Sequence, residues 1–333
     1  MGGERSRADA GAAGMPRAAI ISNPSKDGIR RLREAVAHAE RRQGFAPSLW
    51  IDTSADDPGV GQAREAVEAG VSLVVAAGGD GTVRAVASGL RGTGVPLGIV
   101  PAGTGNLFAR NLQLPVGDLA DAVVVAFSGV DRAVDVVVAE VERADGSEEA
   151  FASLVVAGVG IDAAMIQKTN PTLKRRFGWL AYVDGGFRAL PASAPFHLNY
   201  RLDGAHPRRA RASSVLIANL GSLPGNIELI PDAEYDDGKL DVALLQPRSV
   251  FGWFFVWWKV GWENVVMRRS RLGRRIVERS GGRTEIVYLR GREITVEMPD
   301  GPEEFEVDGD GFGEIVRARF RVEPAALIVR AAE

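Results

Sequence analysis

A single carboxylate stands among glycines at residues 78–82, which read GGDGT. The run VSLVVAA before them is typical of a buried strand, and TVRAVASGL after the glycines has the apolar spacing of a helix. Glycines at such a turn expose backbone N–H groups where the helix dipole is positive, which favours an anion such as phosphate. Because a carboxylate repels phosphates unless a divalent cation lies between them, Asp80 indicates a magnesium nucleotide. The alternative is an ordinary strand-to-helix turn, which glycines also form.

A second glycine turn, PAGTGN at residues 101–106, repeats this arrangement. The strand pattern VPLGIV leads into it, and a helix is predicted from Asn106. In a parallel sheet both turns open on the same carboxyl edge. The sequence therefore predicts that the two turns bind one nucleotide together.

The segments around these turns alternate between strand and helix patterns. Strand patterns such as AAIISNP and SLWIDT are separated by helix patterns, the first of which places Ile29, Leu32, Val36 and Ala39 on one face. This alternation predicts a mainly parallel sheet with helices on both faces. After about residue 130, period-two alternation dominates, as in HLNYRLDG, KLDVALL and GREITVEMP, which predicts an antiparallel β-sandwich.

We therefore predict three parts: a disordered leader at 1–16, an α/β nucleotide-binding domain at 17–130 and a β-sandwich acceptor domain at 131–313. The remaining segment, 314–333, alternates apolar residues with Arg317, Arg319 and Arg321, as in a strand with one exposed face. Its pattern leaves open whether it closes the second domain or returns to the first. We assign it to the first.

Composition restricts the class of protein. The net charge of −3 over 333 residues argues against nucleic acid as a partner. The absence of cysteine rules out disulfides and thiol chemistry and fits a reducing compartment. Residues 1–16 lack the apolar centre of a signal peptide, and the longest apolar run, FGWFFVWW, is shorter than the roughly 20 residues that cross a bilayer. We expect a cytoplasmic protein that does not span a membrane.

The two glycine turns with their helices, GGDGTVRAVASGL and PLGIVPAGTGNLFARNL, resemble the diacylglycerol kinase catalytic-domain family, particularly its soluble bacterial members. SNPSKDG at 22–28 resembles the Asn-Pro nucleotide turn of that family, and PDAEYDDGKLDV at 231–242 resembles its metal-binding stretch. GVGIDAAMI and the later KRRFGWLAYVDGGFRAL resemble its interdomain segment. NAD kinases and phosphofructokinases share GGDGT, but the 231–242 stretch favours the lipid branch, and the Asn-Glu dipeptide usual in NAD kinases does not occur here. The resemblance covers nearly the whole chain after the leader and implies an NAD-kinase-like α/β domain followed by a mainly antiparallel β-sandwich.

The resemblance also implies site residues. The nucleotide site would comprise Asn23, Pro24, Thr53, Gly78, Gly79, Asp80, Gly81, Thr82, Gly103, Thr104 and Asn106. Asp80 would face the magnesium and the triphosphate, and Asp135 would join its metal and water network, although a strand-edge aspartate fits the pattern equally well. A second, structural magnesium would bind the Asp237 carboxylate and the backbone carbonyls of Glu234 and Lys239. On spacing alone this stretch is a solvated Asp-Asp-Gly hairpin.

The general base departs from the family pattern. The family usually has Glu in an Asp-Gly-Glu turn, whereas EFEVDGD places Asp310 at that position. Any carboxylate within hydrogen-bond reach can accept the proton of the attacking hydroxyl, so Asp310 is predicted to act with Asp80 in catalysis. If Asp310 is only a turn residue, the remaining carboxylates are Glu303, Glu304 and Glu306, on a strand expected to alternate them outward.

The resemblance implies transfer of the γ-phosphoryl group of magnesium ATP to a lipid hydroxyl, with the nucleotide between the two domains. Diacylglycerol is the most familiar acceptor, and relatives use sphingoid bases, ceramides or phosphatidylglycerol. The expected partners are ATP and a lipid at a membrane surface, with a homodimer as an open alternative. The Trp- and Arg-rich segment 251–283 either contacts that surface or packs in the core. Two other functions stay open: an NAD-kinase-like kinase of a soluble substrate, and a nucleotide-binding regulator without turnover.

Overall fold

The computed structural model describes residues 14–24, 28–160, 195–223, 227–228, 230, 233–246 and 286–332. The chain forms two compact units, the first comprising residues 1–134 and 325–333 and the second residues 135–324. The first unit thus extends slightly past residue 130 and takes only the end of segment 314–333. The predicted leader up to residue 13, nearly all of the interdomain segment and the segment 251–283 lie outside the described residues.

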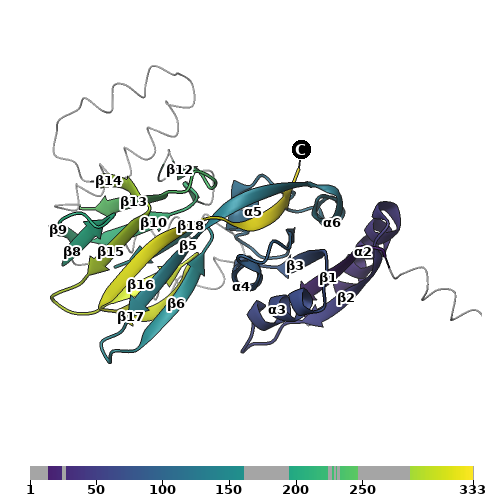
Figure 1. The fold of residues 1–333 in the computed structure, drawn as a ribbon, viewed down its shortest axis with the longest axis horizontal. Helices are drawn as coiled ribbons and strands as arrows, with labels where there is room; N and C mark the ends of the chain where they lie inside the picture. The colour runs from purple at the N-terminus through teal and green to yellow at the C-terminus, as the bar shows by residue number, and fades with distance from the viewer. Residues whose placement is uncertain are drawn as a thin grey trace, which may run out of the picture. The chain divides into compact units, whose positions relative to one another are not determined.

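The first unit is built on a parallel sheet. Its strands are β1 (Arg17–Ser22), β2 (Ala46–Asp52), β3 (Leu73–Gly78) and β4 (Leu97–Pro101), in the order β2-β1-β3-β4 (Figure 1). Every residue of β3 is buried, as expected for a parallel strand covered on both faces. Because the strands run in one direction, the loops that follow them share one edge of the sheet.

Two pairs of helices cover this sheet. These are α2 (Ile29–Gln43) with α6 (Leu119–Ser128), and α3 (Val60–Glu68) with α4 (Asp80–Leu90); Figure 1 shows the pairs on opposite sides of the strands. A short helix, α5 (Leu107–Asn111), follows β4. The predicted inward face of α2 is confirmed at Leu32, Val36 and Ala39, all of which are buried.

The second unit is a sandwich of two layers. The first layer contains β5 (Val130–Glu142), β6 (Glu148–Ser153), β8 (Phe196–Leu202), β9 (Arg208–Ala212), β15 (Glu293–Glu297) and the start of β18 (Arg317–Ala331). The second contains, in spatial order, β14 (Ile286–Gly291), β13 (Leu240–Leu245), β10 (Ser214–Ala218), β7 (Val156–Val159), β16 (Glu303–Val307) and β17 (Asp310–Ile315). A small pair, β11 (Ser222–Leu223) and β12 (Ile227–Glu228), stands apart from them. Neighbouring strands of the second layer are antiparallel, which confirms the predicted sandwich.

One apolar core joins the two layers of this sandwich. Residues such as Leu198 and Phe320 from the first layer pack with Ile217, Val242 and Phe305 from the second, and all five are almost fully buried. Burial of this apolar surface is the main favourable contribution to the stability of the unit.

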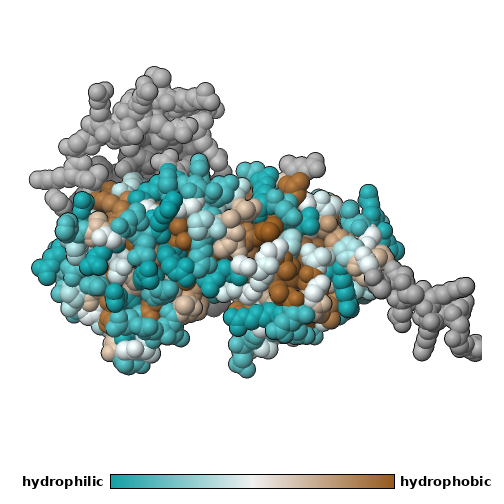
Figure 2. Space-filling view, viewed as in Figure 1, coloured by the Kyte–Doolittle hydropathy of each residue, from teal (hydrophilic) through white to brown (hydrophobic). Residues whose placement is uncertain are grey.

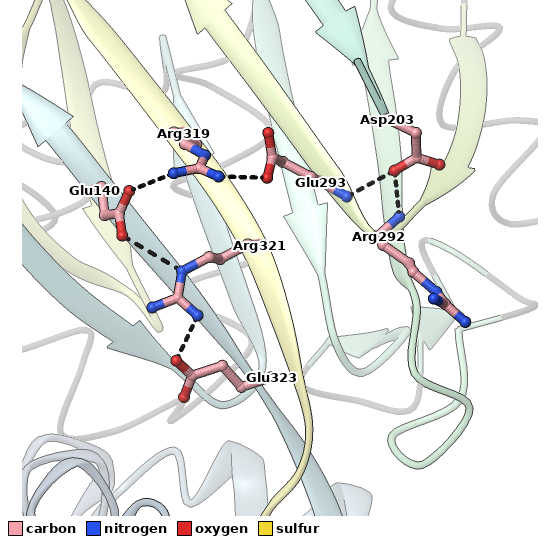
Figure 3. Close-up of polar contacts among 7 residues, drawn as sticks. All are labelled: Glu140, Asp203, Arg292, Glu293, Arg319, Arg321 and Glu323. Carbon is pink, nitrogen blue, oxygen red and sulfur yellow. Dashed lines mark hydrogen bonds and ion pairs between the residues drawn. The ribbon is translucent and has the colours of Figure 1, made fainter. Parts of the chain in front are cut away.

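β18 explains the ambiguity of the C-terminal pattern. Residues 317–321 pair antiparallel with β15, and Val329 pairs parallel with Leu97 of β4, so the strand takes part in both units. The predicted exposed face carries ion pairs: Arg319 contacts Glu140 and Glu293 at 3.4 and 2.7 Å, and Arg321 contacts Glu140 at 3.4 Å (Figure 3).

The visible surface is mostly hydrophilic, with small hydrophobic areas between the polar ones (Figure 2). Among the described residues, the exposed large hydrophobic side chains are those of Met15, Val124, Val130 and Tyr288. No helix in the described part of the chain has the length and hydrophobicity needed to cross a bilayer.

Candidate functional site

The predicted nucleotide-binding residues lie in or directly beside four loops at the carboxyl edge of the parallel sheet. Asn23 and Pro24 follow β1, and Thr53 follows β2, where its N–H donates to the Ser22 carbonyl at 3.0 Å. The other two loops are the glycine turns after β3 and β4. The fold thus brings together residues that are far apart in the sequence.

The two glycine turns touch each other. A Cβ atom on Gly103 would lie 2.6 Å from the Gly79 Cα, and one on Gly105 would lie 2.7 Å from Asp80 Oδ2. Both distances are below ordinary contact, and the Gly79 atom belongs to the backbone. Glycine is therefore required here by the close approach of the two loops.

The Asp80 carboxylate joins the two turns. Its Oδ2 accepts the Asn106 N–H at 2.7 Å and its Oδ1 accepts the Leu107 N–H at 2.6 Å. Asp80, the first residue of α4, therefore caps the start of α5, whose own N-cap residue, Asn106, makes no side-chain cap bond. These N–H groups account for two of the roughly four lone-pair sites of an ionised carboxylate, so they do not by themselves exclude a magnesium ion.

Asn106 closes the second turn from inside. Its Oδ1 accepts the Gly103 N–H at 3.0 Å and its Nδ2 donates to the Gly103 carbonyl at 2.9 Å. Asn106 is buried and has a φ of 50°, a left-handed conformation that asparagine tolerates better than most residues. Thr104 between them is exposed, and Gly81 and Thr82 at the start of α4 are half-buried.

Asp135, in the second unit, is a buried residue of β5 that contacts the loop before β13. It is 2% exposed, its Oδ2 accepts the Gly238 N–H at 2.7 Å, and its own N–H donates to the Tyr235 carbonyl at 2.7 Å. The stretch predicted to bind metal therefore folds over Asp135. A role for Asp135 in a metal and water network stays a prediction.

Asp237 in the same loop faces an arginine. Its Oδ1 accepts the Lys239 N–H at 2.9 Å, and its Oδ2 contacts the Arg290 guanidinium, whose Nε lies 3.4 Å from Asp241 Oδ1. The side chain of Glu234 is exposed. Within the described ranges, no group of three or more His, Asp or Glu side chains is placed to hold one metal ion. The second magnesium site stays a prediction, and Arg290 supplies positive charge at its expected carboxylate.

The turn that carries Asp310 is a tight hairpin. Val307 pairs with Asp310, and the two residues between them, Asp308 and Gly309, have φ values of 51° and 88°, as a type I′ turn requires. Asp310 is the first residue of β17 and is exposed.

Asp308 anchors this hairpin, a role that the sequence did not reveal. Its carboxylate accepts hydrogen bonds from the Ser153 hydroxyl at 2.9 Å and from the N–H groups of Leu154, Val155 and Val156 at 2.9–3.0 Å. Asp308 is 7% exposed, so these bonds are shielded from water. An Asp-Gly pair between apolar strands predicts the turn, but not the donors that lie some 150 residues away.

Glu306 corrects one expectation, since this residue was expected to point outward to solvent. It lies on the face of β16 opposite Phe305 and Val307, as alternation predicts, yet it is only 7% exposed. Burial, then the charges of Asp308 and Asp310, raise the pKa of Glu306 to about 7. Leu216 on β10 and Leu245 on β13, in the same layer, also lie on the face that points away from the sandwich core, and both are buried. Period-two alternation identifies the two faces of a strand but does not show that both are covered.

Comparisons with known proteins agree with this architecture. The family model for the diacylglycerol kinase catalytic domain matches residues 17–139, and that for the YegS C-terminal NAD kinase beta sandwich-like domain matches residues 154–256. A diacylglycerol kinase from Bacillus subtilis is 30% identical over 240 residues, which cover 71% of this chain and 76% of the relative. A probable YegS-like lipid kinase from Stenotrophomonas maltophilia is 33% identical over 242 residues, which cover 69% and 74%.

Solved structures show the same fold. A putative diacylglycerol kinase from Bacillus anthracis superposes with a TM-score of 0.71 at 19% identity, over 95% of this chain and 98% of that one. Yeast NADH kinase superposes more distantly, with a TM-score of 0.51 at 12% identity, over 96% and 84%. The predicted NAD-kinase-like fold is thus confirmed. By its sequence and its two matched domains, the chain belongs to the diacylglycerol kinase catalytic-domain family of kinases.

Proposed function

We propose that this protein is an ATP-dependent lipid kinase that transfers the γ-phosphoryl group to a lipid hydroxyl, working as a peripheral protein at a membrane surface. The observation that carries the proposal is the joining of the two glycine turns through Asp80, which holds the second turn against the start of α4 at one edge of the sheet. Backbone N–H groups at a helix start are well suited to bind phosphate oxygens.

The proposed roles of the residues are as follows. Gly79, Gly81 and Thr82 would bind phosphate at the start of α4, Thr104 is exposed in the second turn, and Asn23 and Thr53 lie in the loops beside them. Magnesium, held through Asp80 and Asp135, would neutralise phosphate oxygens. Asp310, exposed at the start of β17, would accept the proton that the lipid hydroxyl loses as its oxygen attacks the γ-phosphorus.

Diacylglycerol is the first acceptor to test, because the Bacillus subtilis relative is named a diacylglycerol kinase. Labelled ATP and magnesium would be incubated with a total lipid extract, and in a separate arm with NAD but no lipid, before chromatography of the products. We expect label in a lipid that comigrates with phosphatidate. Label in another lipid would change the acceptor. Label in NADP alone would overturn the lipid assignment.

The proposed base can be tested by substitution. Asp310→Asn is expected to lower kcat about 10²–10⁴-fold, the usual contribution of general base catalysis, while KM for ATP changes little. Asp310→Glu, which restores the carboxylate of the family pattern, should keep or raise kcat. If the Asn variant retains full activity, Asp310 is a turn residue only.

A further inference from the structure

A group of arginines at one edge of the sandwich has no acidic partner among the residues that the structure describes. The β8–β9 hairpin carries Arg201, Arg208, Arg209 and Arg211, and all four side chains are exposed. Arg292 lies beside the hairpin, because the Asp203 carboxylate in its turn accepts the N–H groups of Arg292 and Glu293 at 2.8 and 2.9 Å (Figure 3). The five arginines Arg201, Arg208, Arg209, Arg211 and Arg292 are called the basic edge below.

The basic edge differs from the arginines of β18 in the same layer. Arg317, Arg319 and Arg321 each pair with one or more glutamates. None of the basic-edge guanidinium groups forms an ion pair within the described part of the chain; Arg209 donates to Asn199 at 3.2 Å, and Asp203 is engaged by backbone N–H groups. The layer therefore neutralises its arginines on β18 and leaves positive charge concentrated at β9.

Strand order places this charge where a partner can reach it. Among the described strands, β9 is the last of its layer and pairs with β8, and Figure 1 shows it at the edge. Along β9, Ala210 and Ala212 face the core, and Arg208, opposite Tyr200, is the exposed first residue of that face. Arg209 and Arg211 pair with Asn199 and His197 on the outer face. Protection of an edge strand against aggregation explains one or two charges. It does not explain five of one sign across three segments.

We propose that the basic edge is an interaction surface for anionic phospholipid headgroups and brings the protein to the bilayer that holds its acceptor. The choice of a lipid partner rests on the proposed function. Arginine guanidinium groups bind phosphate through paired N–H donors, and clustered basic residues are attracted to anionic bilayers over a distance set by ionic strength. This surface is separate from the segment 251–283, which lies outside the described residues.

The test is sedimentation of the full chain with vesicles of phosphatidylglycerol and phosphatidylcholine, compared with vesicles of phosphatidylcholine alone. The edge variant is Arg208→Gln/Arg209→Gln/Arg211→Gln. The matched control is Arg317→Gln/Arg319→Gln/Arg321→Gln, which removes the same charge from the same layer. We expect the edge variant to lose about 100-fold in its partition onto anionic vesicles, roughly fivefold per charge, and the control to lose less than about threefold. Binding of the wild type should weaken as salt rises.

Three outcomes would overturn the proposal. The wild type could bind both kinds of vesicle equally, or the two triple variants could lose the same affinity, which would make net charge the cause. An RNA or DNA oligonucleotide could also bind through the basic edge more tightly than the vesicles do. Phosphorylation of the acceptor in uncharged detergent micelles separates the two proposals, because the edge variant should keep that activity. If the edge variant loses far more binding to anionic vesicles than the control does, but the wild type phosphorylates no lipid, the proposed function fails and the basic edge stands.

Discussion

At the scale of single residues, three carboxylates in the second unit have different surroundings. Asp308 is buried with four hydrogen-bond donors, Glu306 is buried beside other carboxylates, and Asp310 is exposed. The family resemblance pointed to Asp310, whose role stays a prediction, and the Asp-Gly pair before it has the local signature of a tight turn. That signature did not distinguish Asp308 from a surface residue, because the donors at 153–156 are distant in the chain.

Asp308 should be a major contributor to stability. Asp308→Asn removes an ionised acceptor from Ser153 and from three backbone N–H groups, and it leaves buried donors poorly satisfied. We expect the free energy of unfolding to fall by about 2–4 kcal/mol in urea denaturation. Asp300→Asn, which breaks an exposed contact with His197, should cost less than about 1 kcal/mol. If the two substitutions lower the free energy of unfolding equally, Asp308 does not anchor the hairpin.

Glu306 should make stability depend on pH. Its pKa in the folded protein is raised from 4.5 to about 7, so the folded state holds the proton more tightly than the unfolded state. Its contribution to stability is therefore complete below the unfolded pKa, falls as pH rises toward 7 and is constant above that. Glu306→Gln removes this dependence and should be more stable than the wild type at about pH 8, by roughly 1–3 kcal/mol, but not at about pH 5.

The measurement for Glu306 is urea unfolding at the two pH values. Glu314→Gln on the neighbouring strand β17 is the control, because this substitution removes the same charge from an exposed residue. A Glu306→Gln variant that differs from the wild type by the same amount at both pH values would show that Glu306 has an ordinary pKa.

At the scale of elements, hydrophobic periodicity predicted which faces of helices and strands are buried. It did not predict the contacts between loops. The inward face of α2 and the alternation on β18 follow from spacing alone. The helix α6 was not predicted, although its N-cap Asp118 accepts the Ala120 N–H at 2.8 Å, a local signal that was available in the sequence. The bridge from Asp80 to α5 joins residues 26 and 27 positions apart, which no periodicity records.

The contact between the glycine turns predicts the effect of Gly103→Ala. The added Cβ would lie 2.6 Å from the Gly79 Cα, so the two turns must separate. We expect a loss of about 1–3 kcal/mol in stability and weaker ATP binding, measured by thermal unfolding with and without magnesium ATP. Thr104→Ala, exposed in the same turn, should leave the stability of the ATP-free protein unchanged. If Gly103→Ala unfolds like the wild type and is stabilised equally by ATP, the turns do not need their close contact.

The loop over Asp135 predicts a competition between arginine and metal. The Arg290 guanidinium contacts the Asp237 carboxylate, so it opposes a cation at the predicted second magnesium site. Arg290→Met should therefore increase the rise in Tm that magnesium gives over a chelator, while Arg292→Met should not. The same magnesium effect in all three proteins would exclude Asp237 as a metal ligand that competes with Arg290.

At the scale of the whole molecule, the fold class was predictable because it depends on patterns that run through the chain, and the family was predictable from the resemblance of its motifs. Alternating strand and helix segments indicated the parallel sheet, and period-two strands indicated the sandwich. The start of β18 belongs to the second unit and its end to the first. The alternation of apolar and polar residues along this strand could not indicate that change of unit. The lipid acceptor depends on side chains that no repeating pattern specifies.

Under the proposed function, Asp80 joins the two glycine turns and so builds a phosphate site that serves a lipid kinase. The most direct test compares the wild type with Asp80→Asn and with Asp121→Asn, an exposed carboxylate in the first turn of α6, by measuring transfer of labelled γ-phosphate from magnesium ATP to diacylglycerol in mixed micelles. We predict labelled phosphatidate from the wild type and from Asp121→Asn, and a loss of at least about 100-fold with Asp80→Asn. Full activity in Asp80→Asn would contradict the role of Asp80 in the phosphate site. A folded wild-type protein that labels no lipid would contradict the proposed function.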